Sequence, residues 1–371
     1  MPPRTILLNW VYYHPVGHAV EAFKVAKGLW NANENCEIDL LLNGRTAVEL
    51  AEACDWIHRA YPIDVESFAE GGAGATYTRD LPAAWDFVVT DHRPTCSPFP
   101  FSTPLRAFHD FAARHFQARI WKGGHHELRQ PGAPGYEQNS TIQMHVPDAA
   151  REFVQRLKLG RVNISVMLAG SSPDPIYPTI DWWRRALFVL QNEFPDAHFF
   201  VTGKTAGDDR TSTQAFSQAA FARLAAGSER IFNWCDIGIW NQMALFEQSD
   251  LLISPHTGFA FLAPSVGTPW LAVSGARWPE CYFNDVPFYC VLPDCPQYPC
   301  WMEMKDVCRE RLLSKETVPC MLEELEGKFF DLIHGVHLLL SAEFSFEKAM
   351  ALYRARIEQM GFPPERFFQI V

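Results

Sequence analysis

The sequence predicts an α/β protein of two domains, each built on a mostly parallel sheet. The chain has 371 residues, which is long for a single core and suits two domains of about 150–200 residues each. Hydrophobic residues make up 48% of the chain and charged residues 20%, a balance typical of globular proteins. Short apolar runs alternate with stretches of helical spacing along both halves, and this alternation is typical of parallel strands joined by helices.

In the first half, apolar runs predict the strands and the stretches between them predict the helices. Strands are expected at 5–9, 36–42 and 85–90, helices at 17–30, 46–53 and 105–115, and loops rich in Gly or Pro at 70–76 and 130–135. Residues 56–60 do not favour either state.

The second half alternates more regularly than the first. Strands are expected at 162–168, 197–202, 250–254 and 269–274, and helices at 148–159, 182–193, 240–248, 259–266, 322–337 and 344–360. We therefore predict a Rossmann-like domain over 1–160, a second one over 161–340 with a cysteine-rich segment at 281–320, and a C-terminal helix within 341–371 that can cross back to the first domain.

Charge and cysteine usage exclude several classes of protein. The formal net charge of −11 argues against a nucleic-acid partner, which requires clustered Lys and Arg. We see no apolar run of the ~20 residues that a membrane span needs, and no signal peptide before the short apolar run at 6–8. A cytoplasmic location is expected, where the ten cysteines stay reduced. Six of them lie between Cys281 and Cys320.

Small and polar residues follow three predicted strands of the second domain. These junctions are Gly170-Ser171-Ser172, Gly203-Lys204-Thr205 and His256-Thr257-Gly258. Glycine lets an anion approach the backbone, while hydroxyls, an ammonium and helix N-termini supply donors. Any one of these junctions alone is typical of a helix cap. Together they predict a site for a nucleoside diphosphate.

The segment 249–269, SDLLISPHTGFAFLAPSVGTP, resembles the donor-site segment of family 9 glycosyltransferases, which include the lipopolysaccharide heptosyltransferases. The continuation through Gly275, Pro279, Tyr282-Phe283 and Cys295…Cys300-Trp301 is most similar to the bacterial autotransporter heptosyltransferase branch, which carries a cysteine finger. The resemblance covers about residues 160–325. It implies the GT-B architecture, with two Rossmann-like domains, a cleft between them, and an ADP-linked sugar donor on the C-terminal domain.

The chain departs from the pattern of that family at three places. The lipopolysaccharide heptosyltransferases have Asp where His256 stands, His where Phe261 stands, and a phosphate-binding Lys near 175–177, which reads Pro-Ile-Tyr here. Lys204 could take the role of that lysine. His256 either bonds a donor phosphate or sugar hydroxyl, or caps its own turn. These departures leave the identity of the sugar open.

The first domain is expected to supply the catalytic base. In the resembling family a Gly-Asp pair follows the first strand, and here the pair reads Gly17-His18, with Gly17 expected to contact the donor. A histidine is suited to the role of base because its unperturbed pKa is about 6.5. Capping or packing at the helix start is the alternative role for His18, and Asp91 after the strand 85–90 is the rival base. His125-His126 could line an acceptor site or bind metal, although adjacent histidines are more often plain loop residues.

Four cysteines of the cysteine-rich segment have a spacing that permits a metal site. Cys295, Cys300, Cys308 and Cys320 are separated by four, seven and eleven residues. Four thiolates can form a closed, structural site for Zn or Fe, and the resembling branch holds iron through four cysteines. Buried free thiols are the alternative.

Taken together, the sequence predicts an inverting glycosyltransferase with no catalytic metal. Its donor would be a nucleotide-diphosphate sugar, and its acceptor a protein, a glycan or a small molecule. A sugar-nucleotide epimerase on the same architecture is one alternative, and a non-catalytic nucleotide-sugar-binding scaffold is the other. The sequence leaves the oligomeric state open, with a homo-oligomer among the choices.

Overall fold

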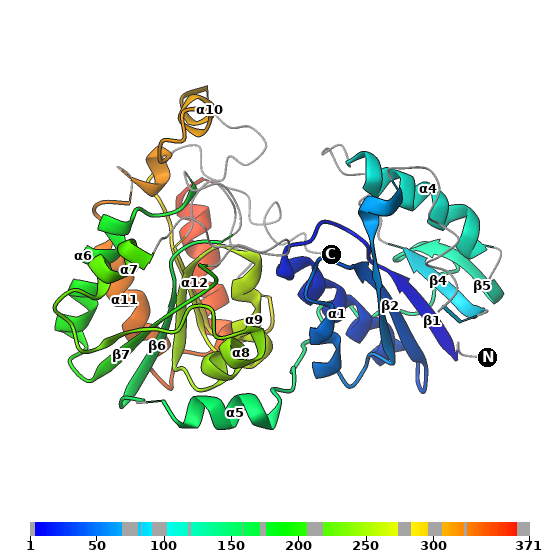
Figure 1. Ribbon diagram of the computed structural model, residues 1–371, viewed down its shortest axis with the longest axis horizontal. Coiled ribbons are helices and arrows are strands. Elements are labelled where there is room, and N and C mark those ends of the chain that lie inside the picture. The colour runs from blue at the N-terminus through cyan, green and yellow to red at the C-terminus, as the bar shows by residue number, and fades with distance from the viewer. Residues whose placement is uncertain are drawn as a thin grey trace. The chain divides into compact units, whose positions relative to one another are not determined.

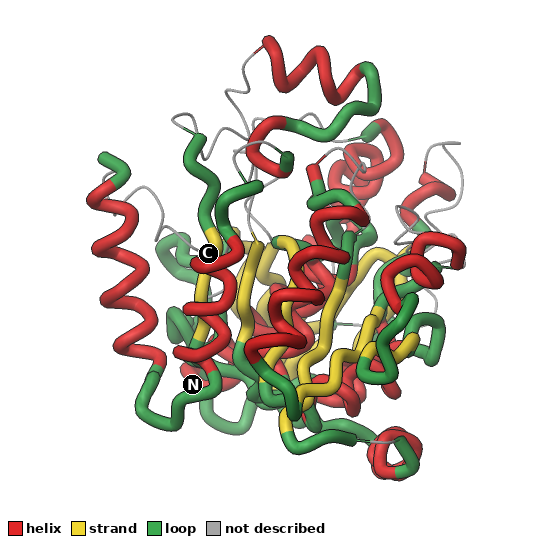
Figure 2. Tube along the Cα trace, turned by 90° about the vertical axis from the view of Figure 1, so that its left-hand side faces the viewer, coloured by secondary structure: helices red, strands yellow, loops and turns green. Residues whose placement is uncertain are grey.

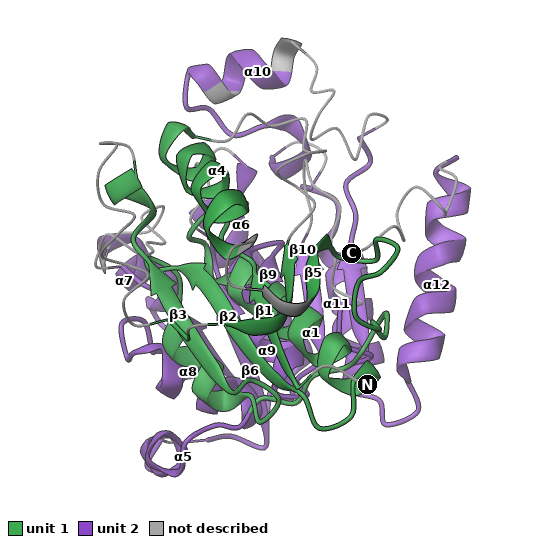
Figure 3. Ribbon diagram, turned by 90° about the vertical axis from the view of Figure 1, so that its right-hand side faces the viewer, with its two compact units in different colours: residues 1–144 green, residues 145–371 purple. Residues whose placement is uncertain are grey.

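The computed structural model divides the chain into two compact units, residues 1–144 and 145–371 (Figure 3). Each unit contains a parallel sheet with helices on both faces, as the strand–helix alternation predicts. The described residues are 4–68, 81–82, 84–90, 102–117, 120–157, 159–170, 176–205, 218–273, 283–295, 306–322 and 325–361.

The first unit is organised around its first strand. The strands described there lie in the order β3 (Arg59–Ile63), β2 (Glu37–Asn43), β1 (Thr5–Asn9), β4 (Trp85–Thr90) and β5 (Ile120–Glu127). Ile6, Leu7 and Leu8 of β1 are completely buried, because a central parallel strand is covered on both faces.

Helices cover both faces of this first sheet. On one face α1 (Val16–Ala32) packs on β2, and the 3₁₀ helix η1 (Val48–Ala53) follows that strand. On the other face α4 (Thr103–Gln117) packs on β5 and on the 3₁₀ helix η2 (Val65–Phe68). The core beneath α4 includes Leu7, Trp85 and Phe108, and the Trp85 indole N–H donates to the buried Asp39 carboxylate at 2.8 Å.

The second unit repeats this plan with a larger sheet. Its described strands lie in the order β11 (Phe288–Val291), β10 (Trp270–Val273), β9 (Leu251–Pro255), β6 (Val162–Met167), β7 (Ala197–Thr202) and β8 (Ile231–Asn233), and all the pairs are parallel.

Two groups of helices enclose this second sheet. On one face lie α6 (Ile180–Glu193), α7 (Gln218–Ala225) and α11 (Phe329–Leu339), with α6 packed on both of the others (Figure 1). Figure 2 views the molecule from the side of these helices, which stand in front of the strands. On the other face lie α8 (Ile239–Glu247), the short α9 (Leu262–Ser265) and the 3₁₀ helix η4 (Gly258–Phe261).

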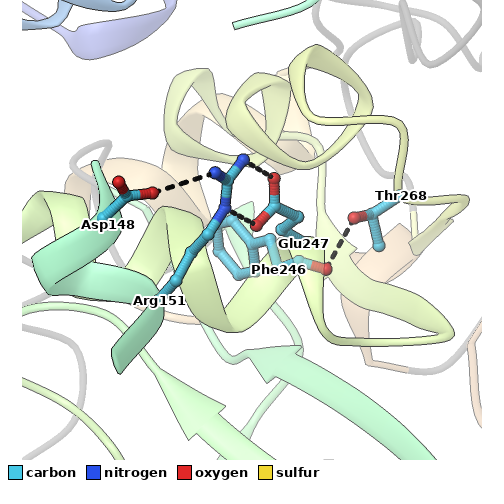
Figure 4. Close-up of polar contacts among 5 residues, drawn as sticks. All are labelled: Asp148, Arg151, Phe246, Glu247 and Thr268. Atoms are coloured by element: carbon cyan, nitrogen blue, oxygen red, sulfur yellow. Dashed lines mark hydrogen bonds and ion pairs between the residues drawn. The ribbon is translucent and has the colours of Figure 1, made fainter. Parts of the chain in front are cut away.

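The helix α5 (Asp148–Gln155) belongs to the second unit, whose boundary therefore falls before residue 160. Arg151 of α5 donates two hydrogen bonds of 2.7 Å to the Glu247 carboxylate at the end of α8, and Asp148 lies 3.5 Å from the same guanidinium (Figure 4). A bidentate pair of this kind fixes the orientation of both helices. The Thr268 hydroxyl, in the loop after α9, donates to the Phe246 carbonyl near the end of α8 at 2.6 Å.

The C-terminal helix α12 (Phe346–Gln359) packs on the edge strand β11, where Phe346 and Tyr353 contact the ring of Phe288. Arg356 donates to the Cys290 carbonyl at 2.6 Å and pairs with Asp331 at 2.9 Å. The described part of this helix is therefore anchored in the second unit.

The remaining short helices described in the second unit are α10 (Asp306–Leu313) and the 3₁₀ helix η5 (Pro319–Met321). Within the described ranges, no helix combines the length and the hydrophobicity needed to cross a membrane.

Several predicted elements differ from the observed ones. Residues 46–53 contain the 3₁₀ helix η1, and the helix expected at 259–266 is split into η4 and α9. The sequence pattern does not predict strands β3, β5, β8 and β11, because they are short or lack an apolar run. In β5 the sequence Gly123-Gly124-His125-His126 reads as a loop, yet a Cβ on Gly123 would lie 2.3 Å from the ring of Phe87, so glycine allows this strand to pass over that side chain.

Gly335 sets the distance between α11 and the second sheet, which leads to a prediction about stability. A Cβ at this position would lie 2.4 Å from the Tyr289 ring and 2.9 Å from Leu271. We expect Gly335→Ala to lower the free energy of unfolding by about 1–3 kcal/mol, since overpacking outweighs the gain of up to ~1 kcal/mol in helix propensity. Urea denaturation measures the change.

The matched control is Gly327→Ala, because a Cβ there would meet nothing within 4 Å. Equal stabilities of the two variants would contradict the tight packing assigned to Gly335.

Candidate functional site

Both sheets reverse their winding direction beside their first strand. In the second unit the reversal lies between β6 and β9, and in the first unit it lies between β1 and β4. The connections after such a strand pair lead to opposite faces of the sheet, which opens a crevice at the carboxyl ends of the strands. Ligands of open α/β sheets bind in this crevice. The two reversal points are therefore where the candidate residues must be sought.

In the second unit the chain after β6 touches the chain after β9. A Cβ on Gly170 would lie 2.7 Å from Cγ2 of Thr257, 2.8 Å from its Cβ and 2.8 Å from the Tyr177 hydroxyl oxygen. Only a residue without a side chain fits so close an approach. The structure thus brings together Gly170 and Thr257, two of the residues that the sequence predicts to share a site.

The Thr257 side chain caps the turn that follows β9. Its backbone is extended, and its hydroxyl oxygen accepts the Ala260 N–H at 3.3 Å while its hydroxyl donates to the Met167 sulfur at 3.4 Å. Thr257 is buried, whereas the next residue, Gly258, is half-buried. The side chain is thus occupied with holding the turn, and Gly258 is the more accessible part of this junction.

The junction after β7 is fixed from two sides. Gly203 has a φ of 130°, and the buried Gln242 amide of α8 accepts its N–H at 2.9 Å and donates to its carbonyl at 3.2 Å. Asp236 accepts the Thr205 N–H at 2.9 Å. Lys204, between these anchored residues, is half-buried at the carboxyl end of β7.

Sequence reasoning misses Gln242 and Asp236. The available signal for Gln242 is a polar amide in a helix whose neighbours, Met243 to Phe246, are all apolar and buried.

His256 lies in an aromatic setting. Its ring stacks on Trp270, with centroids 6.2 Å apart and planes 16° apart, and meets the edge of Phe261 at 6.0 Å. The Trp270 indole is itself fixed by donating to the Ser254 hydroxyl at 2.8 Å. The residue that caps η4 is Thr257 and not His256.

In the first unit, Gly17 and His18 lie in the first turn of α1, directly after the loop that follows β1. The His18 and Tyr12 rings pack nearly perpendicular to each other, with centroids 4.7 Å apart. Its Nδ1 atom lies 3.6 Å from Oε2 of Glu21, and the side chain is 33% exposed. His18 is therefore accessible at the reversal point of the first sheet.

His14 is the other histidine of this loop. Burial lowers the pKa of His14, and the charges of Arg45 and His18 lower that pKa further. A lowered pKa makes His14 a weak proton acceptor.

The adjacent histidines at 125 and 126 belong to β5 and not to a loop. His125 Nε2 contacts the Thr90 hydroxyl, and burial lowers the pKa of His125. The His126 ring packs against two glycines. A Cβ on Gly124 would lie 2.6 Å from this ring, and a Cβ on Gly132 would lie 3.2 Å from it. These side chains point to opposite faces of a strand, so they do not form a metal-binding pair.

Four of the predicted site residues lie outside the described residues. These are Asp91, Ser171, Ser172 and Cys300.

Among the described residues, the cysteines of the predicted metal site form no disulfide bond. Cys295 and Cys308 are half-buried and Cys320 is buried. Within the part of the chain that is described, no three His, Cys, Asp or Glu side chains are grouped so as to hold a metal ion. Because Cys300 lies outside that part, the four-thiolate site stays a prediction.

Comparisons with known proteins give a likeness of structure alone. No family model and no curated protein matches this chain. E. coli ADP-heptose lipopolysaccharide heptosyltransferase II is 11% identical, with a TM-score of 0.56 over 91% of this chain and 98% of its own. A glycosyl transferase family 9 protein from Veillonella parvula is also 11% identical, with a TM-score of 0.56 over 91% of this chain and 97% of its own.

The E. coli heptosyltransferase WaaC with ADP-2-deoxy-2-fluoro heptose is 11% identical, with a TM-score of 0.50 over 78% of this chain and 93% of its own. The chain thus has the GT-B fold, two parallel-sheet α/β domains, as the sequence predicts.

The cysteine prediction is tested by the metal content of the protein. If Cys295, Cys300, Cys308 and Cys320 share a structural ion, elemental analysis of protein purified without an affinity tag should give about one equivalent of Zn or Fe. Chelation or Cys300→Ser should then lower the melting temperature, because such an ion contributes to stability. Protein without metal whose four thiols all titrate freely in the native state would refute the site.

Proposed function

We propose that this protein is an inverting glycosyltransferase that moves a sugar from a nucleotide-diphosphate donor to an acceptor hydroxyl. The observation that carries the proposal is the contact between Gly170 and Thr257 at the reversal point of the second sheet. This contact leaves small residues, and the accessible backbone of Gly258, at the place where the GT-B architecture predicts a donor site.

The second unit would bind the donor. Backbone N–H groups at Gly258 and the small residues Gly170, Ser171 and Ser172 would face the diphosphate, and Lys204 would add a positive charge. His256 would bond a phosphate or a sugar hydroxyl. The stacking on Trp270 supports this role because it holds the His256 ring in a fixed orientation.

The first unit would supply the base. Nε2 of His18 would accept the proton of the acceptor hydroxyl while the acceptor oxygen bonds to the anomeric carbon of the sugar. The bond from that carbon to the diphosphate oxygen breaks on the opposite face, so the configuration inverts. The negative charge of the leaving nucleoside diphosphate would be stabilised by Lys204 and the backbone donors, and a catalytic metal is not part of the proposal.

The names of the structural neighbours guide the choice of donor. Two of these neighbours are heptosyltransferases by name, one described for ADP-heptose and the other with ADP-2-deoxy-2-fluoro heptose. We therefore propose an ADP-linked, heptose-like sugar as the first donor to test, with a protein or a glycan as the acceptor.

A screen of nucleotide sugars, with and without candidate acceptors, tests the proposed reaction. A transferase consumes its donor faster when the acceptor is present, and its product carries the inverted linkage. Activity should persist in the presence of EDTA. Conversion of the donor sugar to its epimer without an acceptor would indicate an epimerase, and binding without turnover would indicate a scaffold.

The donor site predicts the effect of a change at Gly258. Gly258→Val should place a branched side chain in the phosphate space and abolish nucleotide binding in calorimetry, while the circular dichroism spectrum stays native. Gly327→Val is the matched control, because a Cβ there has no neighbour within 4 Å. Unchanged nucleotide affinity in Gly258→Val would place the donor elsewhere.

The base predicts the effect of a change at His18. His18→Ala should lower kcat by on the order of 10²–10⁴ with the affinity for the donor preserved, because a general base acts only in the transition state. The exposed His145 provides a control substitution, His145→Ala, which should be silent. If Asp91→Ala lowers kcat in this way and His18→Ala is mild, Asp91 is the base.

A further inference from the structure

A carboxylate on the same helix faces the ring of His18. Glu21 lies one turn after His18 on α1, and its Oε2 atom is 3.6 Å from His18 Nδ1. The Glu21 side chain is 25% exposed, so it is partly shielded from solvent. Residues three apart on a helix are neighbours on its surface, so the rigid backbone of α1 brings the two side chains together.

The ring of His18 is restrained from a second direction. Tyr12, which is 9% exposed, packs against it in a T-shaped contact with an interplanar angle of 81°. With Nδ1 directed toward Glu21, the Nε2 atom lies on the other side of the ring. The contacts with Glu21 and Tyr12 therefore fix the ring orientation in which Nε2 faces away from Glu21.

We propose that Glu21 is a positioning residue that holds the His18 ring with Nδ1–H toward its carboxylate and the lone pair of Nε2 available as the base. This inference rests on the proposed function, in which His18 accepts a proton. The 3.6 Å separation is longer than a hydrogen bond, and the proposal requires it to shorten when substrate binds, as catalytic contacts often do.

The proposed step balances without a further reactant. The acceptor hydroxyl proton moves to Nε2, the acceptor oxygen bonds to the anomeric carbon, and the electron pair of the broken bond leaves with the nucleoside diphosphate. His18 then carries a positive charge between its two N–H groups. The positive end of the α1 dipole disfavours this charge on His18. The Glu21 carboxylate stays ionised throughout and stabilises the charge.

The experiment combines kinetics with a spectroscopic readout of the ring. Glu21→Ala should lower kcat at least ~10-fold with little change in donor KM, and it should cause little further loss when His18 is already replaced. Glu21→Gln, which keeps an acceptor oxygen but loses the charge, should fall between Glu21→Ala and the native protein. Glu52→Gln changes an exposed carboxylate of the same unit and should be silent.

The tautomer of His18 can be measured without any activity. In protein labelled with ¹⁵N-histidine, the signal absent from His18→Asn identifies the ring, and its nitrogen shifts report which atom carries the proton. We expect Nδ1–H in the native protein and a shift toward Nε2–H in Glu21→Ala.

The two proposals fail in different ways. Suppose that Glu21→Ala keeps the native His18 tautomer and the native kcat, while His18→Ala still loses activity. This result would overturn the positioning role of Glu21 and leave His18 as the base. If the His18 tautomer changes in Glu21→Ala but His18→Ala keeps full activity, the contact between the two side chains is upheld. The proposed role of His18 as the base is then overturned.

Discussion

The reversal of winding direction in each sheet is the constraint on which this structure depends. Each unit places its first strand in the middle of the sheet, adds the next two strands on one side and continues on the other. The connections then leave the carboxyl ends of β1 and β4, or of β6 and β9, toward opposite faces, and the sheet cannot close over the gap between them. The loops at these strand ends can therefore carry residues that serve chemistry.

Close backbone approach shapes the gap in the second unit. The buried strands β6 and β9 are adjacent, and their loops can meet only because Gly170 lacks a side chain beside Thr257. The Thr257 hydroxyl holds the turn, which leaves the backbone at Gly258 to face a ligand. In the first unit the corresponding loop carries a side chain that can accept a proton, with His18 packed against Tyr12 and facing Glu21. The two reversal points thus differ in chemistry, one suited to an anion and the other to proton transfer.

Sequence reasoning predicts the central strands well, because β1, β4, β6 and β7 are largely apolar runs that a buried parallel strand explains. It misses β5, in which two glycines and two histidines carry no hydrophobic signal. It also misreads 259–266, where Pro264 lacks the N–H that a helix continuous from 259 would need. The contact of Gly170 with Thr257 follows from placing both at strand ends.

Other features of the candidate site lie beyond any local pattern. The stacking of His256 on Trp270 and the anchoring of Gly203 by Gln242 join residues that are distant in the chain. Such contacts depend on which strands become neighbours in the sheet, and the spacing of apolar residues does not predict the order of the strands.

The central claim is that the reversal point of the second sheet binds the diphosphate of a nucleotide sugar. A crystal structure of the protein with ADP tests it most directly. We predict diphosphate oxygens within about 2.7–3.2 Å of backbone N–H groups at Gly258 and its neighbours, beside Gly170. A nucleotide bound at the carboxyl ends of β1 and β4, or no nucleotide at saturating concentration, would contradict the account.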